Sequence, residues 1–327
     1  SPETAGTPYD ECRWSLDEER PPPSDLIIAG LDNLPSLIEE FQSLGVRIIF
    51  SALPDEPAER VERDLAAAGF LVISHAQIHR LQPDVPLIVP EVNIQHLSLL
   101  HKQSGSSDGR LISCSNCMVL PIAITLSPLI QIAGIKSVRI STQQALSGGG
   151  RMLLARGRTG RHISSEIPGE AESIVTELTK IMSSEFDIEA SCGRVMRDHG
   201  HYARIEVEFE GQVSAHQVIR AWRESYSRSQ ELNLPSAANR PIIFVDGELD
   251  DDHRWVGFEE IEHPAHDLKA AMAVAVGEVE IEGSNLRFSL MADNTIRGAA
   301  GYSVLLVEQL LADGLLHDNN TILAQEV

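Results

Sequence analysis

The sequence predicts an α/β domain followed by an α+β domain, because the spacing of its apolar residues changes partway along the chain. In the first third, short apolar runs alternate with a helical pattern. Further on, apolar and polar residues alternate one by one. Continuous apolar strands are typical of a parallel sheet covered on both faces, whereas alternating strands leave one face open. With 327 residues, the chain is long enough for two such domains.

Apolar runs predict the strands of the first domain. They lie at 26–29, 47–53, 70–74 and 86–90. Between the second and third runs, Val61, Leu65 and Ala68 recur at helical spacing, and Gly69 follows as the end of that helix. Strand, helix and strand in this order predict part of a dinucleotide-binding domain over residues 1–116.

The second domain is predicted from alternating strands and two amphipathic helices. The strands lie around 136–141, 204–209 and 286–290, and the helices around 174–182 and 218–226. We assign residues 117–294 to this catalytic and dimerisation domain. The acidic stretch 246–267 is expected to be a solvated loop. A last helix, 299–311, is apolar on most sides, so the segment 295–327 is expected to return to the first domain.

Composition restricts the function. The chain has 26 basic and 48 acidic residues and a formal charge of −22, which argues against a nucleic-acid surface. Four cysteines are too few for a disulfide framework, so we expect reduced thiols and a cytoplasmic protein. The uncharged stretch 118–135 contains Pro121 and Pro128, which favours a buried helix over a membrane span.

Cys117 is the first candidate for chemistry. The polar turn 113–116 brings it to the start of the long apolar helix. A thiol there lies near backbone N–H groups and the positive end of the helix dipole, which is expected to lower its pKa. The same donors would stabilise an oxyanion on a carbonyl under attack. A buried structural cysteine is the competing interpretation.

The spacing of Cys114 and Cys117 also allows a redox dithiol, or a zinc site with His199 and His201. The surrounding elements do not match a thioredoxin-like unit, and the histidines lack the spacing of a metal finger. We therefore predict no metal.

Two later segments carry polar groups suited to a substrate. Arg194 suits a carboxylate, since a guanidinium binds one in bidentate fashion, and His201 suits proton handling beside a thiol. The segment 141–150 follows a strand and ends in three glycines, which allow the backbone to approach a ligand closely. A surface arginine, a capping histidine and a flexible loop are the alternatives.

Taken together, in this order, the segments resemble the aspartate-semialdehyde dehydrogenase family, especially its archaeal and fungal branch. The resemblance spans nearly the whole chain. It is carried by 50–54, 78–93, 115–117, 142–150, the segment from Arg194 to His201, and 293–301.

The resemblance implies the following roles. Cys117 is the nucleophile, Asn116 helps the oxyanion, Gln144 orients the substrate and His201 is the acid/base that protonates the reacting oxygen. It also implies substrate and cofactor residues: Arg80 for phosphate, Arg194 for the substrate carboxylate and Glu170 for its amine, with Ser51, Leu53, Ser147, Gly148 and Asn294 near the dinucleotide.

Family members reduce β-aspartyl phosphate to aspartate semialdehyde with NADPH and form dimers or tetramers through the sheet of the second domain. We therefore expect NADP as cofactor, with NAD possible, an acyl phosphate substrate and a homodimer or homotetramer. Alternatives are reduction of another acyl donor such as malonyl-CoA, and a non-catalytic, dimer-forming paralogue.

Three departures from the family pattern qualify this expectation. The glycine-rich turn of the family and its first strand and helix are not found, so roughly thirty residues are expected to be missing from an incomplete Rossmann-type domain. Glu3 stands where an arginine is frequent, which disfavours a 2′-phosphate. In the helix after Gly169, the family's glutamate and lysine align with Ala171 and Ser173, although a shift of one residue would supply Glu170 or Glu172.

Overall fold

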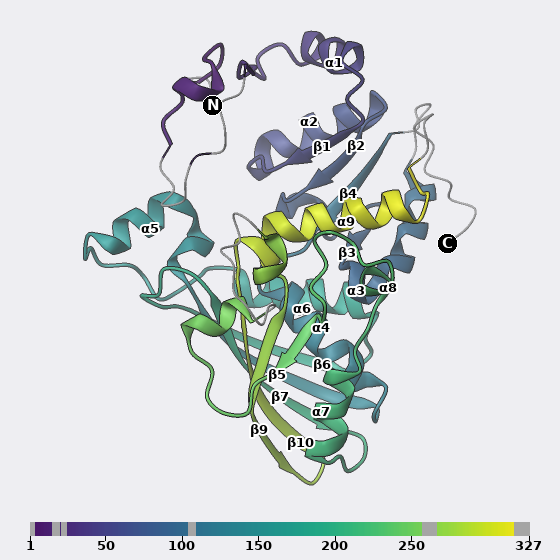
Figure 1. The fold of residues 1–327 in the computed structure, drawn as a ribbon, viewed down its shortest axis with the longest axis vertical. Coiled ribbons are helices and arrows are strands. Elements are labelled where there is room, and N and C mark those ends of the chain that lie inside the picture. Colours follow the sequence, from purple (N-terminus) through teal and green to yellow (C-terminus); the bar gives the residue numbers. More distant parts are fainter. Residues whose placement is uncertain (1–3, 15–19, 21–24, 104–108, 257–266, 317–327) are drawn as a thin grey trace.

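Two β-sheets organise the chain, with helices packed between and around them (Figure 1). This computed structural model describes residues 4–14, 20, 25–103, 109–256 and 267–316.

The first sheet is parallel and has the order β1-β2-β4-β3. Its strands are β1 (Ile48–Ser51), β2 (Leu71–Ser74), β4 (Arg110–Cys114) and β3 (Leu87–Ile88). Ser51 pairs with Ser74, and Ser74 pairs with Ser113, so these three strands end at the same edge. That edge is where open parallel sheets bind ligands.

Helices cover this sheet as the apolar pattern predicts. One face packs against α1 (Leu34–Ser43) and α2 (Asp55–Ala67), whose Val61 and Leu65 contact Phe70 and Val72. The other face lies towards α3 (Pro90–Asn93), the 3₁₀ helix Ile94–Lys102 and the core of the second domain. The predicted strands at 47–53 and 70–74 and the helix between them are confirmed, and 86–90 contains β3.

The predicted strand at 26–29 is wrong. This segment forms an isolated antiparallel bridge between Ile27 and Pro8, and Gly6 donates its backbone N–H to the carbonyl of Ile28 at 2.7 Å. Leu26 and Ile27 are largely exposed. The segment 26–29 therefore pairs with the segment that precedes it and is not a strand of the parallel sheet. The sequence did not indicate β4, which takes in Ser113 and Cys114 from the predicted turn.

The second sheet is mixed and has the order β6-β5-β7-β10-β9-β8. Its strands are β5 (Ile135–Gln144), β6 (Asp187–Arg194), β7 (His201–Phe209), β8 (Ile242–Phe244), β9 (Val274–Glu282) and β10 (Asn285–Ala292). β5 runs parallel to β6 and β8 parallel to β9, and the other neighbours are antiparallel. The three predicted alternating strands are confirmed, whereas β6, β8 and β9 were not predicted.

One face of this sheet is buried by helices. It packs against α4 (Val119–Ile130), α6 (Glu170–Met182) and α7 (Ala215–Arg223). Trp222 of α7 donates its ring N–H to the Thr125 carbonyl of α4 at 2.9 Å. The other face is polar, with Arg139 bound to Glu189 and Glu206. The helix predicted at 218–226 ends before Tyr226, whose side chain is exposed.

Shorter elements complete the second half. They are α5 (Gly150–Arg158) and α8 (Arg228–Glu231). Part of the acidic stretch expected to be a loop is ordered as a 3₁₀ helix, Asp251–Trp255. Trp255 docks it by donating to Asp293 Oδ2 at 3.3 Å. Residues 257–266 of that stretch lie outside the described residues.

The last helix contacts the first sheet through Tyr302. A π-helical turn, Ile296–Ala300, leads into α9 (Gly301–Ala312). The fully buried Tyr302 hydroxyl donates to the Ile88 carbonyl of β3 and accepts from the Ser115 N–H at 3.3 Å. Within the described ranges no helix is long and apolar enough to cross a membrane. The domain boundaries and the missing first unit stay predictions.

Candidate active site

Cys117 and His201 meet between the two sheets. Cys117 lies in the turn that joins β4 to α4, and His201 is the first residue of β7. The Cys117 Sγ atom is 3.3 Å from His201 Nε2, although 84 residues separate the two in the chain. Cys117 is partly exposed, whereas His201 is buried. Cys117 therefore lies closer to the surface than the imidazole beside it.

A backbone amide fixes the proton position on His201. Its Nδ1 atom lies 3.1 Å from the Ala145 N–H. Because a backbone amide only donates, Nδ1 has to accept, and the neutral ring carries its proton on Nε2. Burial, aided by the nearby Arg194, lowers the His201 pKa to about 3. The ring is therefore neutral at physiological pH and presents Nε2–H to the sulfur.

The expected lowering of the Cys117 pKa is wrong for the ligand-free site. Burial, together with the charge of Glu170, raises the pKa of this thiol to about 12. The helix dipole does not compensate, since α4 begins two residues later at Val119. Arg80 and Arg194 act in the opposite direction, but burial outweighs them. The resting pair is a neutral thiol beside a neutral imidazole.

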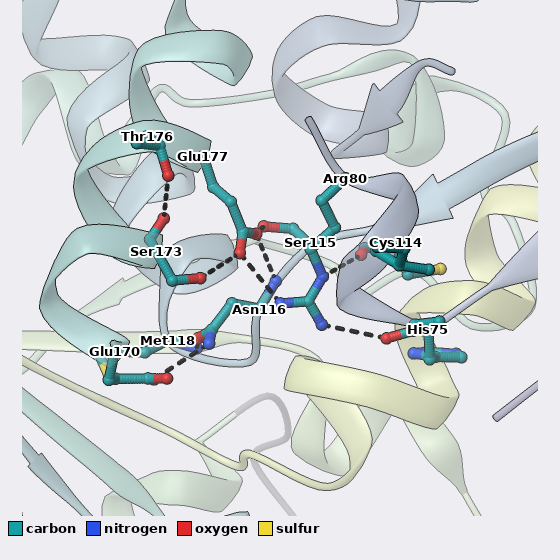
Figure 2. Close-up of polar contacts among 12 residues, drawn as sticks. His75, Arg80, Cys114, Ser115, Asn116, Met118, Glu170, Ser173, Thr176 and Glu177 are labelled. Carbon is teal, nitrogen blue, oxygen red and sulfur yellow. Dashed lines mark hydrogen bonds and ion pairs between the residues drawn. The ribbon is translucent and has the colours of Figure 1, made fainter. Parts of the chain in front are cut away.

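Asn116, Gln144 and Glu170 form a hydrogen-bonded group beside the sulfur. Glu170 Oε1 accepts from Asn116 Nδ2 at 3.0 Å and from Gln144 Nε2 at 2.6 Å. Asn116 Oδ1 in turn accepts from the Met118 N–H at 2.7 Å. Glu170 is the first residue of α6, and its carboxylate points at the turn that contains Asn116 and Cys117 (Figure 2). Glu170, rather than Ala171, brings a carboxylate here, which corresponds to the shift of one residue considered above.

Arg194 lies at the end of β6 and reaches towards the same group. Its Nη1 atom donates to the Ala145 carbonyl at 2.8 Å. Burial lowers its pKa, and the charge of Glu170 acts against that shift. The guanidinium of Arg194, the carboxylate of Glu170 and the thiol of Cys117 therefore lie close enough to influence one another's pKa.

Arg80 is held by protein acceptors on all sides of its guanidinium. Nε donates to the Cys114 carbonyl at 3.1 Å, Nη2 to the His75 carbonyl at 3.1 Å and Nη1 to Glu177 Oε1 at 3.0 Å. Figure 2 shows these three directions around the planar group. The predicted role of Arg80 in phosphate binding stays a prediction, and the structure shows its charge balanced by Glu177.

Sequence reasoning missed Glu177, Ser173 and Ser115 as members of this network. The 1% exposed Glu177 accepts from both serine hydroxyls, at 2.6 Å from Ser173 and 2.9 Å from Ser115. Lys180, one helical turn on, donates to the carbonyls of Arg80, Gln82 and Val85 at 2.7–2.9 Å. The one available signal was Glu177, an ionisable residue on the buried face of an amphipathic helix.

Two of the residues expected near the dinucleotide, Ser147 and Asn294, are in contact with each other. Asn294 Nδ2 donates to Ser147 Oγ at 3.0 Å, and Asn294 Oδ1 accepts from the Gly200 N–H at 3.0 Å. Ser51 and Leu53 lie at and just beyond the carboxyl end of β1. Glu3, the predicted ribose-facing residue, lies outside the described residues.

Gly148 brings bare backbone up to the cysteine–histidine pair. A Cβ atom on this exposed residue would lie 2.8 Å from His201 Nε2 and 3.0 Å from Arg194 Nη1. Any side chain here would therefore collide with the imidazole or the guanidinium. A nicotinamide dinucleotide held by this loop would meet the backbone of Gly148 and the polar side chains of Ser147 and Asn294.

The zinc alternative finds no support. Among the described residues, no group of three or more His, Cys, Asp or Glu is arranged to hold a metal ion. Cys114 is fully buried in β4, and burial raises the pKa of its thiol to about 12.

A parallel α/β domain, a mixed-sheet domain and a cysteine–histidine pair between them fit a nicotinamide-dinucleotide-dependent dehydrogenase. The profile described as "Semialdehyde dehydrogenase, NAD binding domain" matches residues 30–100. An aspartate-semialdehyde dehydrogenase of Methanothermobacter thermautotrophicus is 32% identical, with 94% of this chain and 88% of the relative covered. A malonyl CoA reductase (NADP) of Metallosphaera sedula is 32% identical, with 83% and 78% covered. The chain belongs to the aspartate-semialdehyde dehydrogenase family.

Solved structures agree. An aspartate semialdehyde dehydrogenase with NADP from Candida albicans superposes with a TM-score of 0.77 at 26% identity, with 96% of this chain and 90% of that chain covered. A Vibrio cholerae structure with a TM-score of 0.65 and 22% identity shows the same fold. The chain is thus an oxidoreductase of the nicotinamide-dinucleotide type that acts on small molecules.

Proposed function

We propose that the chain catalyses the NADPH-dependent reductive dephosphorylation of β-aspartyl phosphate to aspartate semialdehyde, with Cys117 as nucleophile. The contact of 3.3 Å between Cys117 Sγ and His201 Nε2 carries the proposal. Such a pair in a partly open site is the arrangement that covalent thiol catalysis needs. Family membership supports the same reaction.

In the first half of the reaction, the Cys117 sulfur attacks the acyl carbon. A C–S bond forms, the C–O bond to phosphate breaks, and phosphate leaves with that electron pair. The neutral thiol and the acyl phosphate dianion together give a thioester and hydrogen phosphate, which takes up the thiol proton, so atoms and charges balance. His201 Nε2–H donates to the sulfur as it loses its proton, which stabilises the developing thiolate.

A bound nicotinamide dinucleotide supplies the hydride for the second half. The residues of this chain hold the thioester and its oxygen. Asn116 and His201 Nε2–H are the hydrogen-bond donors proposed to meet the negative charge on that oxygen. The C–S bond then breaks, the aldehyde leaves, and Cys117 keeps the electron pair and takes a proton from solvent. Gln144 orients the substrate through Glu170, whose Oε1 it binds at 2.6 Å.

Substrate recognition is proposed to use opposite charges on either side of the sulfur. Arg194 binds the carboxylate of the aspartyl group, since a guanidinium forms paired hydrogen bonds with a carboxylate. Glu170 binds the ammonium group. Arg80 contributes positive charge to the phosphate, shared with Glu177.

Acylation of Cys117 tests the function. Incubation with β-aspartyl phosphate without cofactor should add one aspartyl mass to the Cys117 peptide. Cys117→Ser should abolish this label and turnover, whereas Cys114→Ser, at a cysteine buried in β4, should retain both. A label on another residue, or turnover by Cys117→Ser, would overturn the proposal.

Reduction of a CoA thioester is a second candidate, favoured by one observation. The Arg80 guanidinium forms an ion pair with Glu177, which offsets the positive charge that a phosphate would meet. Thioester exchange with Cys117 needs no such charge. Release of free CoA from malonyl-CoA, at a rate that exceeds acylation by the acyl phosphate, would favour this candidate.

For the cofactor we propose NADP, which the Candida albicans structure contains. For the assembly we propose a homodimer or homotetramer through the open face of the second sheet. Ratios of kcat/KM with NADPH and NADH test the first. Mass measurement in solution tests the second, for which a monomer is the contrary result.

A further inference from the structure

We propose that Glu177 is a positioning residue for the reaction, because it fixes the backbone of the turn that carries Cys117 and holds Arg80 against that turn. This role rests on the function proposed above. It adds to that function a residue from the middle of α6 that makes no contact with the sulfur.

Glu177 collects four donors from three parts of the chain. Oε2 accepts from Ser115 Oγ at 2.9 Å and from the Asn116 N–H at 2.8 Å. Oε1 accepts from Ser173 Oγ at 2.6 Å and from Arg80 Nη1 at 3.0 Å. Figure 2 shows the carboxylate between the helix, the turn and the arginine. A buried carboxylate is tolerated only when its oxygens are paired in this way.

Loss of the Glu177 carboxylate would first affect Asn116, the residue before Cys117. Its backbone N–H is bound by Glu177 and its side chain by Glu170, so α6 holds it at two points. If the first contact is lost, the turn can move relative to β7, which carries His201. A displacement of about 1 Å between reacting groups costs on the order of 10²-fold in rate.

The geometry requires a carboxylate at this position, since two of its four partners can only donate. A backbone N–H and a guanidinium N–H have no lone pair to offer an amide N–H. Glutamine has one oxygen and one NH₂ group, so either Asn116 or Arg80 would face a second donor. The two serine hydroxyls can rotate and accept instead. Glu177→Gln therefore disrupts one of the two contacts that matter, at almost unchanged volume.

Glu172→Gln is the matched control. It makes the same chemical change on the same helix, but the Glu172 side chain is exposed. Ser173→Ala is a graded variant, because it removes one of four donors and leaves Asn116 and Arg80 bound.

The experiment measures kcat and KM for aspartate semialdehyde with NADP and phosphate in the wild type and the variants. We expect kcat of Glu177→Gln to fall about 10- to 100-fold, with KM for the semialdehyde within about threefold, because Arg194 and Glu170 still bind it. Glu172→Gln should match the wild type. Glu177→Asp, which keeps both oxygens, should recover part of the lost kcat.

Two results overturn the proposal. One is a Glu177→Gln enzyme with wild-type kcat, and the other is a loss that appears in KM alone. If Glu177→Gln does not unfold cooperatively, Ser115→Ala replaces it, with an expected severalfold loss of kcat. A wild type that turns over no acyl phosphate or semialdehyde refutes the function itself, and with it this role.

Discussion

The Nδ1 atom of His201 accepts the backbone N–H of Ala145 at 3.1 Å, while its Nε2 atom faces the Cys117 sulfur at 3.3 Å. Both contacts together leave one orientation of the ring, since rotating it by 180° would exchange both nitrogens for carbons. His201 therefore works as an Nε2–H donor to the sulfur and to the reacting oxygen.

A donor role predicts that an amide side chain can replace His201 in part. His201→Gln, whose NH₂ group can donate from a similar distance, should retain more activity than His201→Ala. We expect a gap of about tenfold or more in kcat, since one oriented donor to a developing negative charge contributes on the order of 10²-fold. Steady-state kinetics of both variants is the measurement. Equal activity of the two variants would instead indicate a proton acceptor that no amide replaces.

The ionisation of Cys117 makes a second prediction. Because burial raises its thiol pKa to about 12, alkylation of the ligand-free enzyme should be slow at pH 7 and accelerate towards high pH, without a plateau below pH 10. Arg194 lowers this pKa, so Arg194→Gln should shift the profile to still higher pH. Iodoacetamide labelling of the Cys117 peptide at a series of pH values measures it. A plateau near neutral pH in the wild type contradicts the prediction.

The third prediction concerns Gly148, which lies against the reactive edge of His201. Gly148→Ala should reduce kcat strongly, by about 10²-fold or more, because the new methyl group would lie 2.8 Å from Nε2 and displace the ring or the substrate. Gly211→Ala is the control, since its Cβ would meet nothing within 4 Å. Gly148 lies in the 3₁₀ helix Leu146–Gly149 and Gly211 in a bend, and neither has a positive φ, so alanine strains neither backbone. Equal activity of the two variants would show that a methyl group at position 148 does not disturb His201 or the substrate.

The sequence predicted most of what local patterns encode. Val61 and Leu65 at helical spacing indicated α2, and alternation around Ile205 indicated β7. The order of the motifs indicated the pair Cys117 and His201, which the structure brings into contact. These features depend on neighbours in the chain or on residue types that chemistry restricts.

Features that depend on distant packing were not predictable in this way. The pKa of Cys117 is set by burial under both domains, which outweighs the helix end that the sequence suggested. In the sequence, Glu177 looks like any other glutamate of an amphipathic helix. Its role becomes visible only when the fold brings Ser115, Asn116 and Arg80 into contact with it. Leu26–Ala29 has the composition of a strand, but it forms backbone hydrogen bonds with residues 6–9 and does not join the parallel sheet.

The fourth prediction concerns a buried ion pair in the first domain, between Glu62 of α2 and His79. Their Oε2 and Nε2 atoms are 3.0 Å apart, and both side chains are inaccessible to solvent. Burial acts to lower the His79 pKa, but the hydrogen bond and charge of Glu62 outweigh it, so the pKa is raised above 6.5. The pair stabilises the fold through the protonated imidazole.

The sign of the pH dependence follows from that shift. In the unfolded chain His79 titrates near pH 6.5, and in the folded chain at a higher pH. The stabilisation is complete below the unfolded pKa and is lost as the pH rises through the folded pKa. Urea unfolding from pH 6 to pH 9 should therefore show a decrease in the free energy of unfolding attributable to this pair. The decrease should be absent in His79→Gln, and the surface variant His216→Gln should retain it. A His79→Gln profile parallel to the wild type would mean that the imidazole is neutral in the fold and that Glu62 is held by other means.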